Sequence, residues 1–111
     1  MIVENDDFLK TMVSCIDALI KEGYTENYKV FERGLKSLRR ERIYTPSEVK
    51  VLNFYRFEGN SDPADSSILY AIETIDGGKG TLVDAYGPYS DTQITTFMQQ
   101  VHEIHKKVVH N

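Results

Sequence analysis

Six polar residues in the second half of the chain have side chains that suit ligand binding. They are Arg56, Glu58, Asp62, Asp65, Asp84 and Tyr86. Carboxylate oxygens are the ligands that divalent cations prefer in proteins. One interpretation is therefore a small polar pocket for a divalent cation or a phosphate-containing ligand.

The other interpretation of the same residues is structural. Asp84 stands among apolar neighbours, and a buried carboxylate needs a partner, for which Arg56 is the natural candidate. A buried or half-buried ion pair of this kind would fix the register of neighbouring strands. Asp62 and Asp65 would then cap their own loop. The sequence leaves both interpretations open.

Other residues with potential chemistry give weaker signals. His102 and His105 lie three residues apart, one residue short of the zinc-binding H-E-x-x-H spacing, and no third ligand is apparent. Cys15 is the single cysteine, expected to be a partly buried, inert thiol. The sequence contains no nucleophile elbow, P-loop or dinucleotide-binding glycine pattern. We therefore predict no metal site, no cofactor and no catalytic residue, which favours a non-catalytic protein without deciding the question.

The charge is distributed unevenly along the chain. The net charge is −4, yet residues 33–42 hold five basic residues against one acidic residue, and residues 56–91 hold seven acidic against two basic. These stretches are either two solvated surfaces or a self-complementary contact between copies, as in a dimer. The basic stretch, followed by Tyr44, loosely suggests nucleic-acid binding, but the overall acidity argues against it.

Length and composition indicate one globular domain covering residues 1–111. No apolar run approaches the length of a membrane span, and the acidic first residues do not resemble a signal peptide. We therefore expect a cytoplasmic protein that contacts neither membrane nor nucleic acid. Its expected partners are a second copy of itself and an unidentified protein.

The hydrophobic periodicity predicts a helix at each end of the chain. Residues 6–22 form an amphipathic pattern, and Gly23 suits a left-handed helix end at which Tyr24 contacts Leu19. A second helix is expected to begin at Ser90, with Gln93 completing a capping box, and to continue to Val108.

Strands are predicted between these helices. Short strands are expected around residues 28–31 and 35–38, followed by one helical turn that the capping box at 45–48 begins. Residues 49–57 read as a strand with Val49, Val51, Tyr55 and Phe57 on one face. Residues 67–75 and 81–86 flank a glycine-rich turn and form the clearest hairpin.

The predicted fold class is α+β. We expect an antiparallel sheet of about four strands in a meander, flanked by N-terminal and C-terminal helices in the order α-β-β-β-β-α. Both helices are expected on one face of this sheet. The other face would expose aromatic residues as a candidate dimer surface.

Five segments carry a resemblance to a known family. They are Lys21-Glu22-Gly23-Tyr24, Tyr55-Arg56-Phe57-Glu58-Gly59, Ser61-Asp62-Pro63-Ala64-Asp65-Ser66-Ser67, Leu69-Tyr70-Ala71-Ile72 and Leu82-Val83-Asp84-Ala85-Tyr86-Gly87. Together they resemble a family of short, uncharacterised bacterial proteins, some of which are labelled phosphoribosylpyrophosphate synthetase. Such synthetases are far longer, and their Asp-Asp…Thr-Gly-Gly-Thr loop is absent from this sequence. The resemblance implies a small bacterial cytoplasmic domain and names no catalytic residues.

The function expected from the sequence is that of a non-catalytic accessory or interaction domain that self-associates. The alternative is a domain that binds a small ligand or a divalent metal through Arg56, Glu58, Asp62, Asp65, Asp84 and Tyr86.

Overall fold

The computed structural model describes residues 12–32, 34–57, 67–85 and 91–105. These residues form two α-helices, α2 (Met12–Lys21) and α3 (Thr92–Gln99), and seven strands. The strands are β1 (Glu26–Phe31), β2 (Gly34–Ser37), β3 (Ile43–Tyr44), β4 (Val49–Phe57), β5 (Ser67–Thr74), β6 (Lys79–Ala85) and β7 (Glu103–Ile104). A 3₁₀ turn, η1 (Pro46–Glu48), precedes β4.

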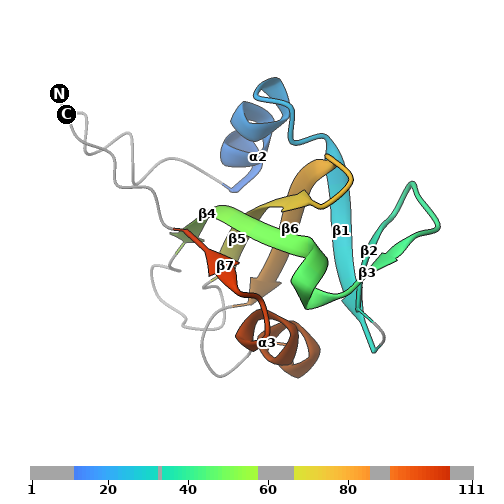
Figure 1. Ribbon diagram of the computed structural model, residues 1–111. Helices are drawn as coiled ribbons and strands as arrows, with labels where there is room; N and C mark the ends of the chain where they lie inside the picture. The colour runs from blue at the N-terminus through green and yellow to red at the C-terminus, as the bar shows by residue number, and fades with distance from the viewer. Residues whose placement is uncertain (1–11, 33, 58–66, 86–90, 106–111) are drawn as a thin grey trace, which may run out of the picture.

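The strands form one curled, mixed sheet in the order β3-β2-β1-β6-β5-β4-β7 (Figure 1). β1 pairs in parallel with β6, and β4 pairs in parallel with β7, whereas the other neighbours are antiparallel. The expected four-stranded antiparallel meander flanked by helices is therefore wrong. Strands β2 and β3 fold back beside β1 as a local unit. Residues 45–48 alone connect β3, at one edge of this order, to β4 near the other edge, and the curl of the sheet brings the two close together.

The two helices pack on opposite faces of the sheet, which corrects the expectation that both cover one face. Leu69 of β5 packs with Leu19 of α2. The neighbouring residue Tyr70 and then Ile72 pack with the cluster that holds Phe97 of α3. A central strand with apolar residues on both faces needs cover on both sides. No helix of the described residues is both long and apolar enough to cross a membrane.

Strand β4 has the predicted bounds, but its faces differ from the prediction. Val51 is opposite Ile72, and the next paired residue, Asn53, is opposite Ala71, so Leu52 forms a bulge. An extra residue in one strand reverses the alternation of side chains beyond it. Val51 therefore packs on the α3 side, while Tyr55 packs on the α2 side. The prediction that they share a face is wrong.

Several local predictions are confirmed. Gly23 adopts a φ of 105°, and the N–H groups of Gly23 and Tyr24 donate to Ile20 and Leu19 at 3.0 and 2.9 Å, as in a Schellman ending. The Thr45 N–H donates to Glu48 Oε1 at 2.9 Å in the capping box of η1. Strands β5 and β6 form the predicted hairpin. The first part of the N-terminal helix prediction lies outside the described residues.

The second helix is shorter than predicted. Asp91 is its N-cap and accepts the Gln93 N–H at 2.7 Å, whereas Ser90 lies outside the described residues. The helix ends at Gln99, and the chain then forms β7, directly after which the His105 N–H donates to Val51 O at 2.8 Å. An unpaired strand edge is costly, so pairing with β4 competes with continuation of the helix.

The close contact between β1 and β6 generates the first prediction. A Cβ at Gly80 would lie 2.2 Å from Glu26 O, so Gly80→Ala must force the two strands apart. We expect its free energy of unfolding to fall by about 1–3 kcal/mol in urea titrations, with faster amide exchange in β1. Gly23→Ala is the control. No atom lies within 4 Å of its added Cβ, so its loss of stability reports only the cost of a positive φ, without a steric clash. Wild-type stability of Gly80→Ala would contradict the close approach.

Candidate functional site

Asp84 is the predicted site residue with the clearest environment. It is 8% exposed on β6, and its Oδ1 accepts the Asp91 N–H at 2.9 Å. Burial raises the pKa of this carboxyl, while the N–H groups of Asp91 and Ala85 oppose that rise. Because Asp91 caps α3, the Asp84 carboxylate fastens the beginning of this helix to β6.

Arg56 and Asp84 lie two strands apart. Arg56 is opposite Ile68 in the β4–β5 pair, and Ile68 is opposite Asp84 in the β5–β6 pair. Neighbouring strands are about 4.8 Å apart, so these backbones are separated by about 10 Å. Backbone N–H groups therefore hold the Asp84 carboxylate where the Arg56 guanidinium was expected. The other four predicted residues, Glu58, Asp62, Asp65 and Tyr86, lie outside the described residues.

A groove lies beside Asp84 where β1 and β6 separate. The two strands pair only at Glu26 with Gly80 and Asn27 with Thr81, and then diverge (Figure 1). The resulting groove has a volume of about 520 Å³, with Ile16 of α2 and Ile94 of α3 among its lining residues. Asp84 and Asp91 contribute carboxylates to its wall.

Arginines of the basic stretch at 33–42 have acidic partners inside the same molecule, one of which, Asp76, belongs to the acidic stretch at 56–91. Arg42 lies 3.4 Å from Asp76 and 3.0 Å from Glu48, and Arg40 lies 4.0 Å from Asp76. Arg39 lies 3.9 Å from Glu26. These arginines have acidic partners within the chain, so they do not need a second copy to neutralise them.

Asp76 is the centre of a polar cluster that the sequence interpretation missed. Its carboxylate accepts the hydroxyl of Thr74 at 2.6 Å and that of Tyr44 at 2.7 Å. These hydrogen bonds lower the pKa of Asp76 to about 2. The sequence analysis counted Asp76 only as one of the seven acids of residues 56–91, beside the glycine-rich turn, although a Thr two residues before a turn Asp is a signal for a local hydrogen bond.

A second missed acid is Glu26 at the beginning of β1. It is 7% exposed, accepts the Ser37 hydroxyl and lies near Arg39. The signal is the alternation of Glu26, Tyr28 and Val30, which places the carboxylate on the buried side of the strand.

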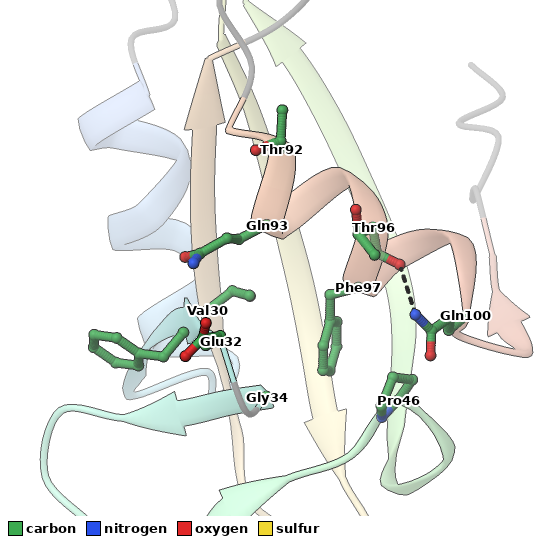
Figure 2. A pocket seen from close by; sticks show the side chains of 10 residues that line it. Val30, Glu32, Gly34, Pro46, Thr92, Gln93, Thr96, Phe97 and Gln100 are labelled. Atoms are coloured by element: carbon green, nitrogen blue, oxygen red, sulfur yellow. Dashed lines mark hydrogen bonds between the residues drawn. The ribbon is translucent and has the colours of Figure 1, made fainter.

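A separate pocket lies between α3, the end of β1 and η1 (Figure 2). Its volume is about 290 Å³. Val30, Phe97 and Pro46 give it apolar walls, while Glu32 and Gln100 contribute polar groups. No sequence motif marks this pocket, because its residues come from three distant segments.

The histidines lie at the other edge of the sheet. His102 lines a cleft of about 360 Å³ together with Lys50 and Glu73, and His105 lies 3.7 Å from Glu103. Within the described ranges, no three His, Cys, Asp or Glu side chains are arranged to hold a metal ion. The prediction that these histidines lie on a helix is wrong, because the helix has ended before His102.

Comparison of the chain with family models, curated proteins and solved structures gives no match. Its function must therefore be argued from the geometry of its own residues.

Asp76 should give the fold a distinctive acid sensitivity. Its folded pKa of about 2 lies below the ordinary value, so its contribution is present above about pH 4 and is lost as the pH falls toward 2. In thermal melts followed by circular dichroism, the wild-type midpoint should therefore fall more steeply over this interval than that of Asp76→Asn. Asp17→Asn, at an exposed position on α2, is the control and should keep the wild-type slope. Equal slopes in all three proteins would refute this role.

The contribution of Asp84 to stability should have the opposite pH dependence to that of Asp76. Burial raises its folded pKa, so its contribution is complete below an unfolded pKa of about 3.9 and declines as the pH rises through the folded value. Asp84→Asn keeps an acceptor for the Asp91 N–H without a buried charge, and it should match or exceed wild-type stability at neutral pH. Asp84→Ala should be less stable than Asp84→Asn by about 1 kcal/mol in urea titrations. Equal stability of the two variants would show that this hydrogen bond does not anchor α3.

Proposed function

We propose that this protein is a non-catalytic interaction domain that self-associates through the outer face of the wing, the unit formed by β1, β2 and β3. The observation that carries the proposal is a set of exposed apolar side chains on this face. Phe31, Leu38 and Ile43 are 51%, 60% and 42% exposed. Lys29, Lys36 and Ile43 form one row across the three strands. Exposed apolar side chains gathered on one face are typical of interaction surfaces.

The packing explains why this face is open. Tyr28 and Val30 of β1 point to the inner side, where they join the core beneath α3. Residues between them, such as Lys29, point outward. Helix α2 packs over β4, β5 and β6, and it borders the outer face of the wing at the groove that Ile16 and Leu38 both line. The rest of this face is not packed against α2 in either core cluster of the described residues. In Figure 1, β2 and β3 extend to the side of the molecule away from α2.

Charge supports a second copy as the partner. Lys36 lies 4.0 Å from Glu41, so the wing carries both signs close together. In a two-fold contact each copy presents the same patch, so a patch with both signs can be self-complementary. The neighbouring arginines already pair with acids of their own chain, which limits the charge repulsion between two wings.

The alternative of a ligand site built on Arg56 and Asp84 has weaker support. The two residues lie on strands that are not neighbours, and the Asp84 carboxylate already accepts a backbone N–H. Self-association is supported by side chains that have no comparable role within the fold.

Analytical ultracentrifugation tests the proposal. We expect wild-type protein to dimerise at micromolar concentration and Leu38→Lys to raise the dissociation constant by at least about tenfold, because a charge would enter an apolar contact. Ile75→Lys is the matched control, since Ile75 is 68% exposed but lies in the β5–β6 turn. A monomeric wild type, or equal effects of the two substitutions, would overturn the proposal.

A further inference from the structure

The pocket between α3, the end of β1 and η1 has the chemistry of a cation site. Figure 2 shows Phe97 descending into the pocket from α3, with Val30 on one side and Pro46 on the other. The Gln93 side chain extends from α3 toward Glu32. An apolar interior with a few polar groups at its edge is the usual form of a small-ligand site.

Glu32 gives this pocket a negative charge. It is exposed, and within the described part of the chain no Lys, Arg or His lies within ion-pair distance of it. Among the residues that the structure describes, no Lys, Arg or His lines the pocket either. This contrasts with Glu26, Glu48 and Asp76, each of which has an arginine partner. The carboxylate of Glu32 is thus available to a positively charged ligand.

Gln100 adds a hydrogen-bond acceptor. Its Nε2 donates to Thr96 O at 3.4 Å, which turns its Oε1 toward Pro46 at the edge of the pocket (Figure 2). Figure 2 shows Gln100 on the opposite side of Phe97 from Glu32, so the amide oxygen and the carboxylate lie at opposite ends of the pocket. The carboxylate accepts hydrogen bonds, so its best complement is a ligand head rich in N–H donors. Ammonium and guanidinium groups meet this requirement, and a short apolar stem would contact Val30, Phe97 and Pro46.

We propose that this pocket binds a small organic cation, an ammonium or guanidinium group on a short apolar stem, paired with Glu32. The cation is either a free amine or guanidine, or a lysine or arginine side chain of another protein, because both present the same chemistry. Of the three exposed apolar residues of the wing, Phe31 also lines the pocket, whereas Leu38 and Ile43 do not, so a substitution at Leu38 separates self-association from ligand binding.

Titration of ¹⁵N-labelled protein with n-butylguanidinium, n-butylammonium and n-butanol tests this inference. The two cations should shift the amide signals of Thr96, Phe97 and Gln100 saturably, with dissociation constants of about 1 mM, as expected for ligands of this size. Butanol has the same stem without the charge and should bind at least about tenfold more weakly. N-acetylarginine amide, if it binds more tightly than butylguanidinium, indicates a protein side chain as the natural occupant.

Three variants test whether Glu32 is the residue that pairs with the bound cation. Glu32→Gln should weaken binding of both cations by about tenfold or more and leave the weak binding of butanol unchanged. Glu22→Gln, an exposed acid at the end of α2, should bind as wild type does, and so should Leu38→Lys. Equal affinity for butanol and the cations, or unchanged affinity in Glu32→Gln, would overturn the proposal whatever the oligomeric state.

Discussion

The parallel contact between β1 and β6 joins the two parts of the sheet, and the arrangement of the whole molecule depends on it. It consists of two residue pairs and requires Gly80 beneath the Glu26 carbonyl. Asp76 reinforces the connection, because its carboxylate binds Tyr44 and Arg42 from the wing. Beyond these contacts β1 and β6 diverge, and the wing is held there by the packing of Tyr28 and Val30 in the core cluster beneath α3. The polar contacts of Asp76 therefore add to apolar packing in holding the wing against the rest of the sheet.

The sequence predicts those features that residues close together in the chain determine. The Schellman ending at Gly23, the capping box at Thr45 and the β5–β6 hairpin each depend on a few adjacent residues, and each is confirmed. The topology depends on pairings between distant segments, such as β1 with β6, that leave no local signal. The bulge at Leu52 also could not be predicted from the sequence. Strand β4 has apolar residues on both faces, so the pattern does not show where the alternation of side chains is reversed. The predicted fold class was therefore wrong, although the predictions of these local elements were correct.

The candidate site was predictable only in part, for a related reason. Asp84 was correctly identified as an acid in need of a partner, but the sequence suggested a side chain, and the structure supplies a backbone N–H. Side-chain partners are conspicuous in a sequence, whereas every residue except proline offers an N–H. Glu32 escaped notice because it stands beside a basic stretch, where an acid reads as part of a mixed charged surface. Its proposed role depends on the apolar side chain of Phe97 on α3 across the pocket, which is far away in sequence.

The acidic residues fall into two groups according to their partners, and the division bears on function. Glu26, Asp76 and Asp84 are engaged by hydroxyls, arginines or backbone N–H groups that hold strands and a helix together. Replacing them alters the native contacts, so any loss of binding in such variants would be hard to separate from a loss of stability. Glu32 has no such engagement within the described chain, and the exposed apolar residues of the wing likewise contribute little to the core. An exposed residue without internal contacts is replaced at little cost to the fold. A binding role for this molecule is therefore best sought among these unengaged residues at the wing and its edge.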